Sequence, residues 1–387
     1  MKILDRVKVL DLTHVWFGPW CTLLLAEMGA EVIRIEPPWG AIDRLAEGAL
    51  FGGRSYTFHH FNMNKKDLTL NLKTSEGLNI FKKLLKKSDV VIQNFRTGTM
   101  KKLGLDYDVL KEINPKIIYA ALSGFGQYGP YSSRGSYAPI AESMSSHTRL
   151  TGDGVDVNGP PILISQSYGD LGPGSLAAMS ILAALRYRDK TGHGQMVDVA
   201  QFDCMVALNP AITGYLLSGL KQWELREKYP RMRGIRELMK TKDGEWIMLA
   251  VSTASSIDSL RALFGEDEVS KEMVREKVAD MNRDEAVEFF VNADIPVAPV
   301  YQVDEVVKDP HINARNMFVE VDHEKAGQIK VINFPVKFSK TPGEITSAAP
   351  ELGEHNIEIL TELGYTEENI RDLQQSGVIS YDKRAHA

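Results

Sequence analysis

The chain has 387 residues, of which 43% are hydrophobic and 25% are charged, and its formal net charge is −6. This composition is typical of a globular protein of two or three domains, and the acidic balance argues against a nucleic-acid binder. No apolar run reaches the roughly 18 residues of a membrane span, and the N-terminal stretch is too short and too charged for a signal peptide. Only two cysteines occur, Cys21 and Cys204, so we expect reduced thiols, no metal site and a cytoplasmic protein.

The first third of the chain alternates strand and helix patterns. We predict strands at residues 7–11, 31–36, 68–72, 90–95 and 117–122, and helices at 19–28 and 75–87. Strands that alternate with helices in this way favour a parallel sheet covered by helices, and therefore an α/β fold.

The middle of the chain begins with two loops rich in glycine and proline, at residues 123–134 and 152–172. The pattern then predicts a buried, apolar helix at 175–188, a strand at 196–199 and a helix at 201–217. After Gly219 the chain becomes more charged, which indicates a linker or the start of a smaller domain. Further on we predict strands at 244–251 and 295–301, and helices at 255–264, 266–292 (two), 354–363 and 366–375.

Common cofactor and hydrolase motifs are weak or missing. Gly124, Gly126 and Gly129 match the dinucleotide-binding pattern, but Pro130 follows them and no helix opens there. We therefore expect no nicotinamide or flavin site. The nucleophile elbow of serine hydrolases and the paired-histidine zinc motif do not occur.

The segment QSYGDLGPG, which contains Asp170, is the strongest local feature. An aspartate before a helix is most often an N-cap, and this is one alternative. The three glycines around Asp170 would also let a ligand approach the backbone closely, and the helix dipole would keep the carboxylate ionised. Such a carboxylate can act as a nucleophile.

Several basic side chains could bind a polyphosphate, or could be solvated surface charges. They are Arg34, Arg44, Lys65, Lys66, Lys73, Arg96, Lys101 and Lys102. Composition alone does not choose between these two alternatives.

Ordered blocks along nearly the whole chain resemble the class III CoA-transferase family, which includes formyl-CoA transferase and carnitine CoA-transferase. The blocks include VLDLTHVWFGPWCTLLLAEMGAEVIRIEPPWG, SDVVIQNFRTGTMKKLGLDYDVL, SYGDLGPGSLAAMSILAALRYRDKTGHGQMVDVAQFD and DIPVAPVYQVDEVVKDPHINARNMFVEVDH. The resemblance implies a doubly wound parallel sheet in a large domain built from residues 1–218 and 326–387. It also implies a smaller α+β domain inserted at 219–325, and an interlocked homodimer.

The resemblance further implies that Asp170 is the catalytic nucleophile. Its carboxylate would attack a donor acyl-CoA, and the reaction would pass through an aspartyl anhydride and an aspartyl-CoA thioester before a carboxylic acid accepts CoA. Coenzyme A and acyl-CoA are then substrates, and no permanently bound cofactor is expected. The enzyme has to align the reacting groups, exclude water and stabilise each oxyanion.

The family's binding positions map onto this chain residue by residue. The resemblance implies CoA contacts at His14, Val15, Leu70, Asn71, Leu72, Lys73, Asn94, Phe95, Arg96 and Lys102. It implies a substrate pocket at Trp16, Phe17 and Tyr137. Formyl-CoA transferase has small or polar residues in place of Trp16 and Phe17, so these rings favour an aromatic or branched acid, unless they pack in the core.

Three alternatives stay open. An α-methylacyl-CoA racemase of the same fold would need an acid/base histidine where this chain has Gly135, Ser136 and Tyr137, and the nearest histidine is His147. A non-catalytic CoA-binding protein would share the fold. A carnitine-type transferase would bind a trimethylammonium acid through its aromatic rings.

Overall fold

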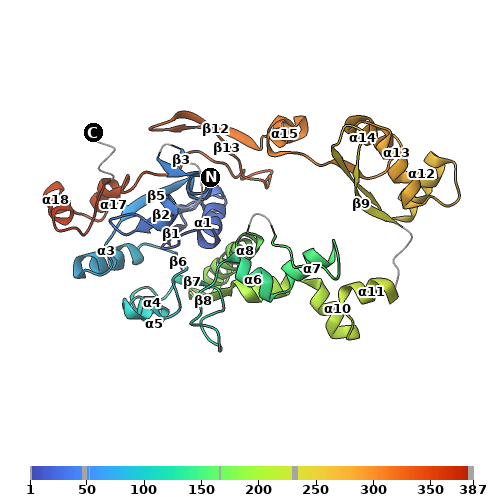
Figure 1. Cartoon of the computed structure of the whole chain (residues 1–387). Coiled ribbons are helices and arrows are strands. Elements are labelled where there is room, and N and C mark those ends of the chain that lie inside the picture. Colours follow the sequence, from blue (N-terminus) through green and yellow to red (C-terminus); the bar gives the residue numbers. More distant parts are fainter. Residues whose placement is uncertain (1, 46–49, 52, 165–166, 229–233, 382–387) are drawn as a thin grey trace. The chain divides into compact units, whose positions relative to one another are not determined.

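A computed structural model describes residues 2–45, 50–51, 53–164, 167–228 and 234–381 (Figure 1). The chain forms two compact units, one of Met1–Ile212 with Asn316–Ala387 and the other of Thr213–Arg315. The predicted domain boundaries at residues 219 and 325 stay predictions.

The larger unit is built on a six-stranded sheet in the order β5-β2-β1-β6-β7-β8, in which every neighbouring pair is parallel. In that order the strands are Lys65–Thr69, Glu31–Glu36, Lys8–Asp11, Val90–Gln93, Ile118–Ser123 and Met196–Ala200. The predicted α/β fold with a parallel sheet is confirmed. The chain leaves β1 in one direction, toward β2 and β5, and returns to β6 on the other side of β1. Ligands of such sheets bind at the carboxyl ends of the strands, where the strand order reverses.

Successive side chains of each strand enter two different cores, because side chains alternate between the faces of a sheet. Val9 packs with helices α1 (Phe17–Glu27) and α8 (Tyr168–Thr191), whereas Leu10 packs with α3 (Ser75–Leu85). The second core also includes residues of α5 (Tyr107–Ile113), α17 (Asn356–Glu362) and α18 (Glu367–Gln375). Helices therefore cover both faces of the sheet, and both ends of the chain contribute to one core.

Shorter elements complete the larger unit. They are η1 (Ile42–Arg44), β3 (Leu50–Phe51), β4 (Arg54–Ser55), α2 (Tyr56–Asn62), α4 (Thr99–Lys102), α6 (Ala138–Met144), α7 (His147–Asp153), α9 (Gln201–Ala207) and the hairpin β12 (Phe318–His323) with β13 (Gly327–Ile332).

Two predictions for residues 152–217 were wrong. The segment 152–172 is not one loop, since α8 begins at Tyr168, and α8 is not buried all round, because Met179 is 59% exposed. The single helix expected at 201–217 is two helices, α9 and α10 (Pro210–Ser218), since the proline at the start of α10 has no N–H to continue a helix.

The smaller unit has a three-stranded antiparallel sheet in the order β11-β10-β9. Its elements are α11 (Gln222–Lys228), β9 (Ile235–Lys240), β10 (Trp246–Val251), α12 (Ala254–Phe264), α13 (Lys271–Ala279), α14 (Arg283–Val291), β11 (Val297–Pro299), α15 (Val303–Lys308) and α16 (Pro310–Ala314). Strand β9 was not among the predicted elements, and it follows the charged segment that indicated a linker or the start of a smaller domain. Its exposed charged side chains made the segment look unlike a strand in the sequence, although Ile235 and Met239 are buried in the core of this unit.

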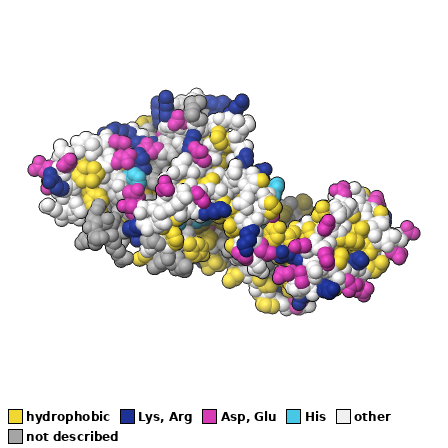
Figure 2. Space-filling view, turned by 90° about the horizontal axis from the view of Figure 1, so that it is seen from above, with side chains coloured by type: hydrophobic (Ala, Val, Ile, Leu, Met, Phe, Trp, Pro, Cys, Tyr) yellow, Lys and Arg dark blue, Asp and Glu magenta, His cyan; other side chains and the backbone are white. Residues whose placement is uncertain are grey.

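The surface carries charges of both signs. In the face that Figure 2 shows, basic and acidic side chains are interspersed among hydrophobic ones. None of the described helices is long and apolar enough to cross a membrane.

Three of the eight basic side chains singled out above belong to the interior. Arg34 forms ion pairs with Glu36 and Asp43, both at 2.8 Å, and Arg44 pairs with Glu36 at 2.8 Å. The third, Lys65, lies 3.2 Å from Asp11. All are buried, so neither of the two alternatives, polyphosphate ligand or solvated charge, holds for these three.

Burial also changes the protonation of a glutamate at the end of α1. Glu27 is 3% exposed, and burial raises its pKa from the ordinary value of 4.5 to about 8. The folded protein therefore holds a proton that the unfolded chain releases above about pH 4.5, and stability falls between that pH and about pH 8. We expect the Glu27→Gln variant to lose this pH dependence, which is at most about 1.4 kcal/mol per pH unit.

Urea unfolding at about pH 5 and about pH 8 checks this expectation. The matched control is Glu112→Gln, which changes an exposed glutamate on α5 of the same unit. The expectation would be contradicted if the free energy of unfolding changed between the two pH values by the same amount in wild type and in Glu27→Gln.

Candidate active site

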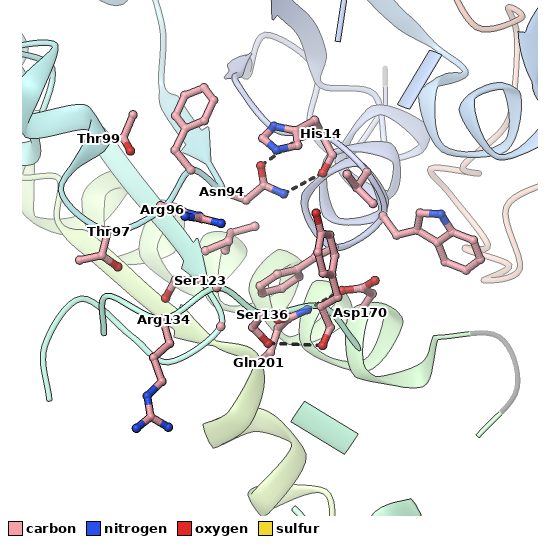
Figure 3. A pocket seen from close by; sticks show the side chains of 18 of the residues that line it. His14, Asn94, Arg96, Thr97, Thr99, Ser123, Arg134, Ser136, Asp170 and Gln201 are labelled. Atoms are coloured by element: carbon pink, nitrogen blue, oxygen red, sulfur yellow. Dashed lines mark hydrogen bonds between the residues drawn. The ribbon is translucent and has the colours of Figure 1, made fainter. Parts of the chain in front are cut away.

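A cavity of about 370 Å³ opens at the carboxyl ends of β1, β6, β7 and β8, where the strand order reverses (Figure 3). It is lined by His14, Val15, Trp16, Phe17, Asn94, Phe95, Arg96, Thr97, Thr99, Leu122, Ser123, Gly124, Ser132, Arg134, Gly135, Ser136, Tyr137, Asp170 and Gln201. Nine of the predicted site residues are therefore brought together here.

Asp170 lies in the first turn of α8 and is 7% exposed. The N-cap position belongs to Ser167, whose backbone is left-handed with φ of 47°, so the alternative that Asp170 is the N-cap is wrong. The Oδ1 atom of Asp170 accepts a hydrogen bond from Nε2 of Gln201 at 2.5 Å. The positive end of the dipole of this 24-residue helix stabilises a negative charge at Asp170.

The glycines around Asp170 serve protein packing. A Cβ atom at Gly169 would lie 2.7 Å from the carbonyl oxygen of Ala138, and one at Gly174 would lie 2.8 Å from that of Phe17. The expectation that these glycines admit a ligand is thus wrong for these two, because segments of the chain already occupy the space. The Gly169 N–H donates to Oε1 of Glu142 at 2.7 Å, and Glu142 is fully buried.

The loop after β1 holds a strained residue. Val15 has a φ of 71°, a conformation that is rare for a β-branched residue and costs of order 1–3 kcal/mol. Its N–H donates to Oδ2 of Asp43 at 3.0 Å, and the other oxygen of Asp43 pairs with Arg34. The buried ion pairs therefore hold the loop that forms one wall of the cavity.

Asn94 joins the loops after β1 and β6. Its Oδ1 accepts from the His14 N–H at 3.1 Å, and its Nδ2 donates to the His14 carbonyl at 2.8 Å (Figure 3). The His14 ring lies 5.8 Å from that of Phe95. Burial lowers the pKa of His14, so this imidazole is neutral at neutral pH.

Two arginines line the cavity. The Arg96 guanidinium lies beside Gly135, where its Nη2 would be 3.5 Å from a Cβ atom, an ordinary contact distance. Arg134 stacks on the ring of Tyr131 at 3.7 Å, and in Figure 3 its guanidinium points away from the other labelled side chains. Ser136 packs closely against Gly124. A Cβ atom at Gly124 would lie 2.2 Å from the Cβ atom of Ser136, so only glycine leaves enough space there.

The aromatic side chains differ in their packing. Phe17 is 5% exposed and belongs to the core between the sheet and α1, although it also borders the cavity. The Trp16 ring lies 5.0 Å from that of Phe61, and Tyr137 is 66% exposed. Packing in the core and lining the cavity are therefore compatible for Phe17.

Five predicted CoA contacts do not line this cavity. Leu70 is buried in the core, and Asn71 accepts the Lys73 N–H at 3.1 Å. Leu72 is partly buried against the same core, and Lys102 is exposed on α4. Residues 70–73 follow β5, which lies on the other side of β1 from β6.

Gln201 is the residue that sequence reasoning missed. It directly follows β8, and the only signal was this position after a strand that ends at the same edge as the others. Its type did not suggest catalysis, because an amide neither titrates nor attacks a substrate.

The family model for CoA-transferase family III matches residues 4–356. The chain belongs to CoA-transferase family III. The resemblance found in the sequence is thus confirmed, and so is the prediction of an enzyme that transfers CoA.

Curated relatives support this assignment over nearly their whole length. The chain is 33% identical to the succinyl-CoA–L-malate CoA-transferase beta subunit of Chloroflexus aurantiacus, covering 97% of this chain and 98% of that protein. It is 32% identical to the formyl-CoA:oxalate CoA-transferase of Streptomyces coelicolor, covering 98% and 99%. Among solved structures, a CAIB/BAIF family protein from Brucella suis matches with a TM-score of 0.80 and 29% identity, covering 94% and 99%.

Proposed function

We propose that this family III enzyme moves CoA from a donor acyl-CoA to a carboxylic acid through covalent intermediates on Asp170. The observation that carries the proposal is the position of this carboxylate, buried in the cavity at the switch point of the sheet, in the first turn of a long helix. The helix dipole favours the charged form of this nucleophile, and burial would shield the covalent intermediates from water.

The proposed reaction has four displacements. Asp170 attacks the donor thioester, which forms a mixed anhydride and releases CoA thiolate. The thiolate attacks the aspartyl carbonyl, and the donor acid leaves. The acceptor carboxylate then attacks the aspartyl thioester and expels the thiolate, which finally attacks the acceptor carbonyl and frees Asp170. Thioester is exchanged for thioester, so the reaction needs no external energy source.

For CoA we propose a path along the carboxyl edge of the sheet. His14, Val15, Asn94, Phe95 and Arg96 would contact its thioester arm in the cavity. Leu70, Asn71, Leu72, Lys73 and Lys102 stay proposed contacts for the nucleotide, because a ligand as long as CoA extends beyond the cavity. The cationic groups suit its phosphates.

For the acceptor we propose a branched or aromatic acid, since Trp16 and Phe17 border the cavity. The relatives named for L-malate and oxalate, together with Arg96 and Arg134 at the cavity, support dicarboxylic acids as a second class to test.

The racemase alternative has less support. Nε2 of His147 is hydrogen-bonded to the carbonyl of Met205 at 3.0 Å, and His147 does not line the cavity that contains Asp170. The second acid/base group that a racemase requires would have to come from elsewhere.

We further propose an interlocked homodimer, with residues 219–325 as an inserted domain, and a cytoplasmic location. Helix α10 supports a partner, because it is strongly apolar and none of its residues is buried. Tyr215, Leu216 and Leu217 are 55%, 77% and 84% exposed. Exposed apolar surface of this kind marks interfaces.

The test combines product analysis with protein mass. Purified protein is incubated with succinyl-CoA or acetyl-CoA and a panel of aromatic, branched and dicarboxylic acids, and the CoA products are separated by chromatography. We expect a new acyl-CoA and a hydroxylamine-sensitive CoA adduct on Asp170. If no acid accepts CoA, but a 2-methylacyl-CoA exchanges its α-proton with deuterated water, the racemase alternative holds instead.

A further inference from the structure

Gln201 is a hydrogen-bond partner of the Asp170 side chain. It is the first residue of α9, it is 4% exposed, and its Nε2 donates to Oδ1 of Asp170 (Figure 3). A buried amide in contact with a nucleophile either fixes its orientation or takes part in the chemistry. The steps of the proposed reaction distinguish the two roles.

The reaction treats the two oxygens of Asp170 differently. With Oδ1 held by Gln201, Oδ2 is the oxygen that attacks the donor thioester and becomes the bridging atom of the anhydride. Oδ1 is then the carbonyl oxygen of both the anhydride and the aspartyl thioester. When the CoA thiolate attacks Cγ, the C–S bond forms and the carbonyl electron pair moves to Oδ1. Collapse of this intermediate expels the donor carboxylate together with the bridging oxygen.

The same atom carries the charge in the next step. The acceptor carboxylate attacks Cγ of the thioester, negative charge returns to Oδ1, and collapse expels the CoA thiolate. In the ground-state carboxylate the charge is shared by two oxygens, whereas in both tetrahedral intermediates it is concentrated on Oδ1. A hydrogen bond to Oδ1 is therefore stronger in these transition states than before the reaction, which is the requirement for catalysis.

The main-chain donors beside Asp170 are already engaged. N–H groups in the first turn of a helix often stabilise an oxyanion. Here the Gly169 N–H donates to Glu142 at 2.7 Å. The N–H groups of Asp170 and Leu171 both donate to the Ser167 carbonyl, at 2.9 and 3.2 Å. These three donors are not available to Oδ1, whereas the amide of Gln201 already points at it.

We propose that Gln201 is a catalytic residue whose side-chain N–H stabilises the oxyanion formed on the aspartyl carbonyl. This inference rests on the proposed function, because it assumes the covalent intermediates on Asp170. In this proposal Gln201 stabilises the transition states of the second and third displacements only. In the first and fourth, the charge develops on the carbonyl oxygen of the substrate.

The test is the Gln201→Met variant, which keeps the length of the side chain and removes the donor. We expect kcat to fall by about 10²–10³, the loss that follows removal of one oxyanion donor, with the KM for acyl-CoA nearly unchanged. The Gln201→Asn variant, in which the amide is too short to reach Oδ1, should show the same pattern. Urea unfolding of each variant checks that the fold is retained.

Two exchange reactions separate the steps. Exchange of labelled CoA into the donor acyl-CoA needs only the first displacement and its reversal, whereas exchange of the labelled donor acid also needs attack on the aspartyl carbonyl. We expect Gln201→Met to slow acid exchange at least about tenfold more than CoA exchange. Intact mass at early times after mixing with acyl-CoA alone should show slower formation of the CoA thioester in the variant.

Each outcome has a separate meaning. Equal losses in both exchanges would assign Gln201 a role only in positioning Asp170 and overturn the inference, as would wild-type rates in the variant. If the wild type itself forms no adduct and transfers no CoA, the proposed function has failed rather than the role of Gln201.

Discussion

Asp170→Asn should reduce CoA transfer by about four orders of magnitude or more, because the amide that replaces the carboxylate cannot attack a thioester. The substitution keeps the shape of the side chain and its place in the first turn of α8. We therefore expect binding of CoA and the stability of the protein to change little. Initial rates with the best donor and acceptor, together with intact mass, measure the effect.

The matched control for this variant is Asp203→Asn. Asp203 also lies in the first turn of a helix, α9, but it is exposed and does not line the cavity. This control should keep wild-type rates and the adduct. Retention of the CoA adduct by Asp170→Asn would show that another residue carries the covalent intermediate.

Arg34→Met should produce the largest loss of stability, about 3–5 kcal/mol in the free energy of unfolding. The Arg34 guanidinium is fully buried and bonds to Glu36 and Asp43 at 2.8 Å and to Asn62 at 2.9 Å. Removal of the cation takes from Asp43 its ion pair and leaves Glu36 with Arg44 alone, and a buried charge that loses such a partner is costly. Urea unfolding at neutral pH measures the change.

An exposed arginine provides the comparison. Arg261 pairs with Asp258 at 3.2 Å on the surface of α12, and we expect Arg261→Met to cost at most about 1 kcal/mol. Similar losses in the two variants would contradict the role of burial. Because Asp43 joins Arg34 to the Val15 N–H, we also expect Arg34→Met to weaken acyl-CoA binding under conditions in which it is folded.

Local patterns were sufficient for most of the sheet. The strand at 31–36 was predicted with the bounds of β2, and the apolar stripe of 75–87 placed α3, because each pattern is complete within one element. Strand β9 was not predicted, because three of its six residues are charged. Its pairing partners are residues of β10, which come after a turn. Charged side chains on an edge strand interrupt the alternation of apolar and polar residues by which a strand is predicted.

The motif around Asp170 was sufficient to make it a candidate site residue. Its proposed role as the nucleophile came from the family resemblance. The same motif misled us about the glycines, because Gly169 and Gly174 contact Ala138 and Phe17, which lie far from them in the sequence. In a sequence motif, the close approach of another segment is indicated only by small residues such as glycine. The motif does not say whether the neighbour is a ligand or another segment.

The sequence by itself determined the parallel α/β class, the family and the candidate nucleophile, since these depend on periodicity and on ordered motifs. Only the tertiary structure decided that Arg34, Arg44 and Lys65 are buried, and that Gln201 contacts Asp170. The reason is that, apart from Glu36 beside Arg34 on β2, the acidic partners of these charges lie 8 to 54 residues away, and 31 positions separate Gln201 from Asp170. Such pairs meet only after the strands have taken their order in the sheet, so neither member carries a local signal of the other.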